Sequence, residues 1–299
     1  MKKYTNIAIV ASFFGLWMDS YFSTKHQIIA GFFLIFTFGI LHGANDILLV
    51  EKLNMEPSIS KLKILSYYVV VVLIGLFLFC TIPQIALLLF IIVSAYHFGE
   101  QQWQKLEPHF PKWLVILFQS FYGFVILFLL FVFHASEVQN IISSIADISI
   151  PIPYFLLLLQ VSGVVFIGLS AYFYWKLNEI RNKIILEFFY LILFAIIFRS
   201  SSLIWGFAIY FVLWHSIPSI IDQVKFLNRT FSMTYFIAYC RSAGIYWLVS
   251  IIGIALIYFT LKEEKLFNAL FFSFLAAITF PHTVVITRMF RGKKKANQK

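Results

Sequence analysis

The sequence has few charged residues. Asp, Glu, Lys and Arg make up 12% of its 299 residues, whereas 61% are hydrophobic and the mean hydropathy is +0.89. A soluble core of this length does not need so much apolar surface, and the roughly 10-residue alternating segments of a transmembrane β-barrel are missing. Apolar stretches of about 17–25 residues between short charged loops are typical of transmembrane helices. The sequence therefore predicts an all-α, polytopic transmembrane helical bundle.

Cysteine and acidic residues are scarce too. The two cysteines, Cys80 and Cys240, are too few for a disulfide framework. Acidic residues number 13 against 23 Lys and Arg, which gives a formal net charge of +10. The basic residues fall in the gaps between apolar stretches and in the tail at 291–299, as membrane topology signals do. We therefore expect membrane lipid as a partner, and no nucleic acid.

Ten membrane spans are predicted, with boundaries uncertain by about two to four residues. They cover residues 6–23, 27–49, 64–82, 84–103, 113–134, 153–175, 183–198, 202–220, 243–260 and 266–288. The first resembles a secretory signal but lacks a small-x-small cleavage site after it, so we interpret it as a retained helix. Residues 135–150 and 231–241 are expected along the membrane interface. With no linker or internal repeat, residues 1–299 are interpreted as a single integral-membrane domain.

The positions of the basic residues predict the orientation of these spans. With a cytoplasmic N-terminus, only Lys25, Arg199, Lys262 and Lys265 of the 23 Lys and Arg fall in outer segments, which leaves 19 inside. This bias indicates ten helices with both termini in the cytoplasm. It also separates Cys80, near an outer helix end, from Cys240 on the inner side. We expect a multi-pass protein of the cell membrane, the inner membrane in a bacterium.

Four of the seven histidines lie inside predicted spans. His42, His97, His215 and His282 occupy the second, fourth, eighth and tenth spans, each near the inner end. They precede the next inner basic residue by ten, eight, ten and six positions, so their depths agree to about one helical turn. The pattern predicts that the four imidazoles converge. The other three, His26, His109 and His134, fall at or beyond span ends and are expected to be interfacial or solvated.

Convergent imidazoles indicate a metal site, because neutral imidazole suits iron, copper, zinc and nickel. Ligating histidines usually donate their second N–H to a carboxylate or carbonyl. Candidates for that supporting role are Asp46 at i+4 from His42, Glu100 at i+3 from His97, Gln101 beside it, and Asp222 two turns after His215. A polar network or proton path is the alternative, since ionisable residues at membrane depth usually serve function.

Several metal-site motifs are absent. The sequence has no HxxxH or HxxHH boxes of membrane desaturases, no HExxH, and no two histidines 13–14 residues apart on one helix as in cytochrome b haem sites. A mononuclear centre built from single histidines remains. The glycines in HGAND and HFGEQQ leave two readings open, close helix approach or access of a substrate to the backbone.

Four histidine-bearing segments carry a family resemblance. HGANDILL (42–49), SAYHFGEQQW (94–103), FVLWHSIPSIID (211–222) and FPH (280–282) resemble those of the Brp/Blh family of bacterial and archaeal membrane β-carotene 15,15′-dioxygenases. The resemblance implies iron bound by His42, His97 and His215. Members of that family carry another histidine where this sequence has Ser219. Either His282 completes the site, or the site has three histidines.

The resemblance also implies the reaction. We expect an Fe(2+)-dependent oxidoreductase that cleaves the central double bond of β-carotene, or of a similar carotenoid, with dioxygen to give retinal. The substrate would enter laterally from the lipid, and a rhodopsin could receive the product. Two other classes remain open from the residues alone: a proton or metal-ion transporter that uses the intramembrane histidines and Asp46 as a relay, and a haem-binding membrane protein.

Overall fold

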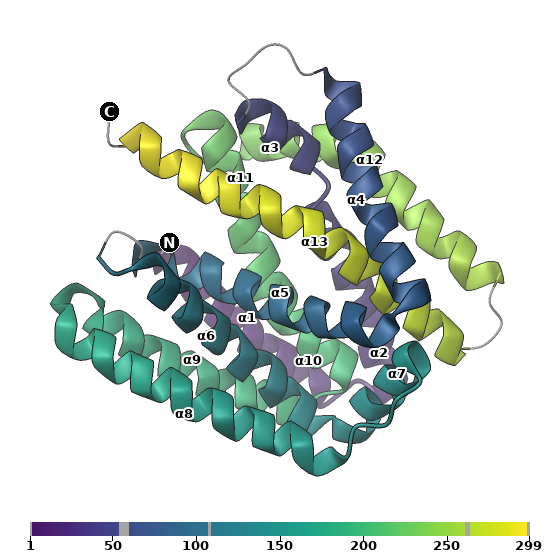
Figure 1. Cartoon of the computed structure of the whole chain (residues 1–299), viewed down its shortest axis with the longest axis horizontal. Helices are drawn as coiled ribbons and strands as arrows, with labels where there is room; N and C mark the ends of the chain where they lie inside the picture. The colour runs from purple at the N-terminus through teal and green to yellow at the C-terminus, as the bar shows by residue number, and fades with distance from the viewer. Residues whose placement is uncertain (1, 54–59, 107–108, 261–263, 298–299) are drawn as a thin grey trace. The chain divides into compact units, whose positions relative to one another are not determined.

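The computed structural model describes residues 2–53, 60–106, 109–260 and 264–297, and these ranges are helical, with no strand (Figure 1). The α-helices in chain order are α1 (Lys2–Asp19), α2 (Thr24–Leu34), α3 (Asp46–Leu53), α4 (Lys61–Thr81), α5 (Pro83–Trp103), α6 (Lys112–Phe133), α7 (Ala135–Ala146), α8 (Ile152–Lys176), α9 (Arg181–Ser200), α10 (Leu203–Tyr210), α11 (Ile217–Asn228), α12 (Met233–Thr260) and α13 (Glu264–Asn297). The π-helical segments are η1 (Ile35–Gly39) and η4 (Phe211–Ser216), and short 3₁₀ turns are η2 (Gln104–Leu106) and η3 (Asn178–Ile180). The all-helical prediction is confirmed.

Seven helical segments in the described ranges are long and apolar enough to cross a membrane. They are Lys61–Thr81, Pro83–Trp103, Lys112–Phe133, Ile152–Lys176, Leu203–Asn228, Met233–Leu256 and Leu270–Gly292. In the segments from α4, α8 and α12 only 17% of the apolar window is buried, so most of it faces outward, as lipid contact requires. The chain is therefore a multi-pass membrane protein in its architecture.

The remaining three predicted spans are not among these seven segments. The spans at 6–23 and 183–198 correspond to α1 and α9, which are not among the seven. The span predicted at 27–49 is interrupted, because α2 passes into η1 and residues 42–45 form a turn before α3. The two segments expected along the interface are also helical: 135–146 forms α7, and 233–241 is part of the longer α12.

Helix starts follow from local capping. The Ser60 hydroxyl accepts a hydrogen bond from Lys63 N at 3.4 Å at the start of α4, and Ser202 does the same for Trp205 N at the start of α10. Such caps satisfy backbone N–H groups that have no partner within the helix. In α8, Pro153 stands in the first turn, where its missing N–H costs nothing.

The chain divides into two compact units. The first unit comprises 1–35, 94–140 and 149–215, and the second comprises 36–93, 141–148 and 216–299.

In the first unit, two glycines bring α5 and α6 into backbone contact. A Cβ at Gly99 would lie 1.8 Å from the Gln119 carbonyl oxygen, and one at Gly123 would lie 1.8 Å from the Ala95 carbonyl oxygen. Neither position admits a side chain, so the glycines permit an approach that alanine would prevent. Of the two readings left open for the HFGEQQ glycine, close helix approach is the one the contacts support. His97 lies between the two contact points on α5.

In the second unit, α13 packs against α3 and α4. Leu49, Val285, Ile286, Met289 and Phe290 form a buried apolar cluster between α3 and α13. Against α4, a Cβ at Gly75 would lie 3.2 Å from Ala277 on α13, so small residues again allow close packing. Pro281 stands inside α13 and His282 follows it directly. This packing holds the segment that carries His282 beside the start of α3.

Candidate metal centre

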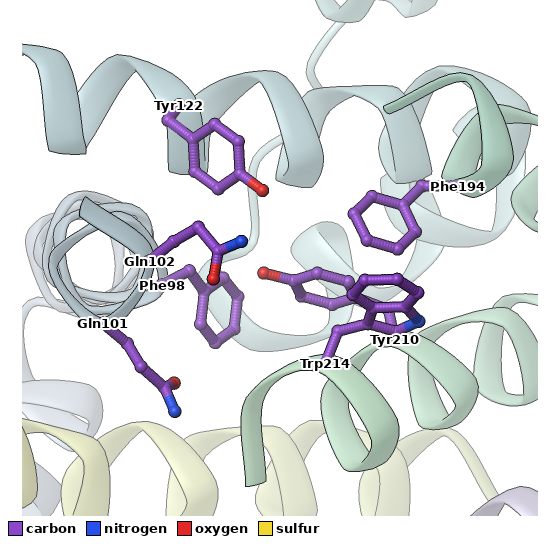
Figure 2. A pocket seen from close by; sticks show the side chains of 7 residues that line it. All are labelled: Phe98, Gln101, Gln102, Tyr122, Phe194, Tyr210 and Trp214. Carbon is purple, nitrogen blue, oxygen red and sulfur yellow. The ribbon is translucent and has the colours of Figure 1, made fainter. Parts of the chain in front are cut away.

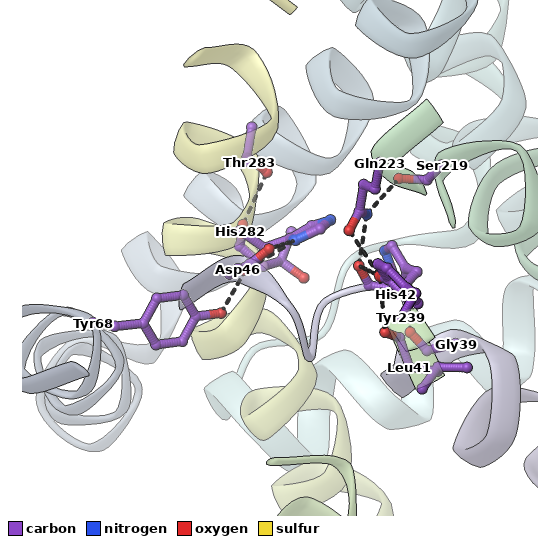
Figure 3. A network of polar contacts seen from close by, with 11 residues as sticks. Gly39, Leu41, His42, Asp46, Tyr68, Ser219, Gln223, Tyr239, His282 and Thr283 are labelled. Carbon is purple, nitrogen blue, oxygen red and sulfur yellow. Dashed lines mark hydrogen bonds and ion pairs between the residues drawn. The ribbon is translucent and has the colours of Figure 1, made fainter. Parts of the chain in front are cut away.

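The second unit contains one pair of buried histidines. His42 is 6% exposed and His282 is 3% exposed, and their ring centroids lie 4.6 Å apart with the rings nearly perpendicular. His42 occupies the turn that follows η1, and its Nδ1 lies within hydrogen-bond distance of the Gly39 carbonyl oxygen. His282 projects from α13 toward the same region (Figure 3). Two imidazoles from segments far apart in sequence are thus adjacent.

Asp46 contacts His282. Its two carboxylate oxygens lie 2.9 and 3.0 Å from His282 Nδ1, and the Tyr68 hydroxyl donates to Oδ2 at 2.8 Å. The i+4 spacing had paired Asp46 with His42, but residues 42–45 form a turn, so helical spacing does not apply there. Asp46 is instead the first residue of α3, where it is 1% exposed. The arrangement is that of a carboxylate that orients an imidazole.

A second polar cluster surrounds the backbone of His42. Gln223 Nε2 donates to the His42 carbonyl oxygen at 2.7 Å and to Ser219 Oγ at 3.1 Å, while Gln223 Oε1 accepts from the Tyr239 hydroxyl at 2.8 Å. Gln223 and Ser219 are both buried, at 0% and 1% exposure. Sequence reasoning missed Gln223, although an amide four residues after Ser219 on an otherwise apolar helix face was a usable signal.

Asn45 holds the turn at 42–45, which lies between η1 and α3, in place. Its Nδ2 donates to the Tyr239 carbonyl oxygen at 2.9 Å, and its Oδ1 accepts from the Ser242 hydroxyl at 2.8 Å. Asn45 is 1% exposed. In the segment HGAND, therefore, the asparagine anchors the turn to α12, and the aspartate supports His282. Gly43 lies against the His282 ring, since a Cβ there would be 3.6 Å from Nδ1.

The first unit contains the other pair. His97 and His215 are 2% and 1% exposed, and their ring centroids lie 4.7 Å apart. Aromatic rings flank His215: Phe98 at 4.8 Å between centroids and Phe211, which stacks on it at 5.6 Å. Gln101 Nε2 donates to the His215 carbonyl oxygen at 3.1 Å. Gln101 thus contacts His215 through the backbone, which ties α5 to η4.

The other two residues predicted to support a histidine, Glu100 and Asp222, show different surroundings. Glu100 is 1% exposed and accepts from the Tyr96 hydroxyl at 2.6 Å. Asp222 lies half-buried on α11.

Of the histidines expected outside the site, His26 and His109 are exposed and His134 is half-buried. The four histidines of the predicted spans are therefore the buried ones.

Glu187 is a buried carboxylate that sequence reasoning missed. It lies on α9 at 2% exposure, where the Tyr122 hydroxyl donates to Oε2 at 2.8 Å and Gln102 Nε2 donates to Oε1. Lys183, one turn earlier, donates to the Gln102 carbonyl oxygen. The tertiary partners come from α5 and α6, so the sequence around Glu187 gave no indication of them.

The fold and these residues define a class: an all-helical, multi-pass membrane protein with four buried histidines. Buried imidazoles of this kind could hold a metal ion, and in the second unit His42 and His282 each offer a ring nitrogen for one. The chain matches the family model of beta-carotene 15,15'-dioxygenase over residues 33–290 and belongs to that family. This confirms the family suggested by the histidine-bearing segments. No curated protein and no solved structure was found to match the chain.

Proposed function

We propose that the protein is an iron(II)-dependent dioxygenase that cleaves the central double bond of β-carotene, or of a similar carotenoid, to give retinal. In this proposal His42, His97, His215 and His282 ligate one iron ion. Membership of the beta-carotene 15,15'-dioxygenase family supports the reaction class. The observation that carries the proposal is the burial of a histidine pair in each unit, with ring centroids 4.6 and 4.7 Å apart.

The donor set suits a redox metal. In the second unit both histidines have an oxygen at Nδ1, the Gly39 carbonyl for His42 and the Asp46 carboxylate for His282. An acceptor at Nδ1 fixes the tautomer and orients Nε2 as the ligating atom. Four neutral nitrogens leave coordination positions for small ligands on an octahedral ion, and iron accepts imidazole readily. When bound, the iron would supply the binding and activation of dioxygen.

The chain's own residues would position the metal and shield it from water. Asp46 would fix the His282 ring, and Gln223 would hold the backbone of His42 through its carbonyl oxygen. Phe98 and Phe211 surround His215 with apolar rings, which suits a hydrocarbon substrate better than a polar one. A carotenoid partitions into lipid, so we propose that it enters laterally from the bilayer. A bacterial inner membrane is the proposed location, and a rhodopsin is a proposed acceptor of the product.

Metal content and product analysis of the purified protein test this proposal. The expected result is about one iron per chain, no Soret band, and conversion of β-carotene to retinal that stops when iron is removed and resumes when it is restored. A Soret band would indicate a haem protein. Absence of both iron and retinal would overturn the proposal in favour of a relay, for which proton or metal-ion flux in proteoliposomes is the assay.

A further inference from the structure

The first unit contains a small polar cavity beside the histidine pair His97 and His215, and two of its lining residues, Phe98 and Gln101, contact His215. Phe98, Phe194 and Trp214 form its apolar walls, while Gln101, Gln102, Tyr122 and Tyr210 contribute polar groups. Figure 2 shows the amide of Gln102 and the hydroxyls of Tyr122 and Tyr210 turned toward the same space. The cavity volume is about 10 Å³. This is close to the lower limit of roughly 10–15 Å³ for one water molecule, and far too small for a carotenoid ring.

The polar groups around the cavity have hydrogen-bonding capacity to spare. Gln102 uses Nε2 on Glu187, and Tyr122 uses its hydroxyl hydrogen on the same carboxylate at 2.8 Å. Within the described part of the chain, no hydrogen bond is seen for Gln102 Oε1 or the Tyr210 hydroxyl, and Gln101 Oε1, on a further lining residue, is buried without a partner. Tyr210 is only 4% exposed. Buried hydroxyls and amides in native proteins are almost always satisfied by protein or by ordered water.

We propose that the cavity is a binding site for one water molecule, which bridges Gln102, Tyr122 and Tyr210. The water would accept a hydrogen bond from the Tyr210 hydroxyl and donate to Gln102 Oε1 and to the Tyr122 oxygen. That gives the three hydrogen bonds typical of a buried water. An apolar gas such as dioxygen fits poorly, because it would leave the same three groups unsatisfied.

The water would connect the helices that carry one histidine pair. Gln102 follows His97 by five residues on α5, and Tyr210 precedes His215 by five residues, at the end of α10. Lys183 and Glu187 on α9 already hold Gln102 by its carbonyl oxygen and its amide. A water at this point extends that network to α10. It would act as a positioning element for the segments around His97 and His215.

A double-mutant cycle in the purified full-length protein tests the site. Tyr122→Phe and Tyr210→Phe should each lower Tm. Tyr210→Phe removes its hydrogen bond to the water, and Tyr122→Phe removes the one from the water and also the one to Glu187; a loss of about 2–4 °C per kcal/mol is typical for a chain of this size. No direct hydrogen bond joins the two hydroxyls. A shared water therefore makes the double variant lose clearly less than the sum of the single losses.

Tyr4→Phe is the matched control. Its hydroxyl donates to the Leu213 carbonyl oxygen in the same unit and does not line the cavity. Tyr4→Phe combined with Tyr122→Phe should be additive. Additive losses for Tyr122→Phe and Tyr210→Phe would overturn the proposal.

A high-resolution density map gives an independent readout. One peak within hydrogen-bond distance of all three groups is expected, and xenon under pressure should not replace it, because xenon prefers dry apolar cavities. A site without density, or one that takes up xenon, would also overturn the proposal. Both measurements use protein without substrate, so they neither support nor weaken the proposed dioxygenase activity.

Discussion

Asp46 and His282 stand 236 residues apart in the chain, yet both carboxylate oxygens of Asp46 lie within 3.0 Å of His282 Nδ1. Tyr68 donates to one of these oxygens, so the carboxylate is itself held in place. A carboxylate acceptor on Nδ1 limits rotation of the ring and leaves Nε2 as the ligating nitrogen. Asp46, the first residue of α3, therefore orients the His282 ring.

Asp46→Asn should weaken iron retention by roughly tenfold to a hundredfold while the protein stays folded. Asparagine offers one neutral acceptor where aspartate offers two charged ones, so the ring is held less firmly. Iron remaining after a timed exposure to chelator, measured per mole of protein, records the change. Tyr68→Phe should have a smaller effect in the same direction, since it removes one hydrogen bond to Asp46.

Asp147→Asn is the control for Asp46→Asn, because it makes the same substitution at an exposed position. Asp147 is exposed and has a φ of 52°, a conformation that asparagine also tolerates. Its iron retention should match the unmodified protein. Equal retention in Asp46→Asn as well would reassign Asp46 to a structural hydrogen bond.

Alanine at His42, His97 or His215 should each abolish colour loss in cells that accumulate β-carotene. His282→Ala should be inactive too, because the proposal assigns it as the fourth ligand and Asp46 orients its ring. Near-normal activity of His282→Ala would indicate a three-histidine centre. Normal cleavage by both His42→Ala and His97→Ala would refute the metal site altogether.

Ser219→His examines the position where the family resemblance implies a histidine. Position 219 lies one turn after His215 and is 1% exposed, with Gln223 donating to its side chain. An imidazole there must displace Gln223, so we expect a lower Tm than in the unmodified protein. Restored cleavage in the double variant His282→Ala, Ser219→His would show that the two positions can substitute for each other as ligands. Continued inactivity, with His282→Ala itself folded, would show that they cannot.

Gly99→Ala should destabilise the protein by about 1–3 kcal/mol or more, because the added methyl group meets the Gln119 backbone. Gly163→Ala on α8 is the matched control, since a Cβ there meets nothing within 4 Å. Removing a helical glycine at an open position gains about 0.5–1 kcal/mol. Thermal unfolding in detergent should therefore shift in opposite directions for the two variants. Equal Tm values would contradict the backbone contact between α5 and α6.

The charge distribution makes a prediction about topology. A reporter fused after Lys299 should be cytoplasmic, and one inserted near Asp147 should be external, because 19 of the 23 basic residues fall in the segments assigned inside. An enzymatic reporter pair that is active on opposite sides of the membrane distinguishes these cases. An external C-terminal reporter would invalidate the matched depths of the four histidines.

The helices could be predicted from the sequence because long apolar stretches have few alternatives in lipid. The four buried histidines could be identified for the same reason: an imidazole inside such a stretch is conspicuous. Their partners could not. Asp46 is close to His42 in sequence, but the turn at 42–45 directs it to His282 instead. A spacing rule fails where the helix it assumes is broken.

Gln223 and Glu187 show a second limit of the sequence. Each is a polar residue on an amphipathic or apolar helix, and nothing near it in sequence reveals what it bonds. Gln223 reaches His42 across 181 positions, and Glu187 receives Tyr122 across 65. Such pairs depend on tertiary packing, which local pattern does not encode. At Gly99 the sequence left two readings open, close helix approach or substrate access, and the contact with Gln119 that favours close approach is visible only in the structure.

The burial of Glu187 has a consequence for how the protein is made. A carboxylate inside a membrane helix raises the cost of inserting that helix from the translocon, and α9, which carries Glu187 in its first half, is not among the seven strongly apolar helices. Its tertiary hydrogen-bond donors, Gln102 and Tyr122, lie on α5 and α6 and leave the ribosome first. The seventh predicted span thus meets a membrane in which its donors are already present. A circular permutation that places α9 before α5 would deprive the nascent helix of both donors, so we expect it to insert α9 less efficiently.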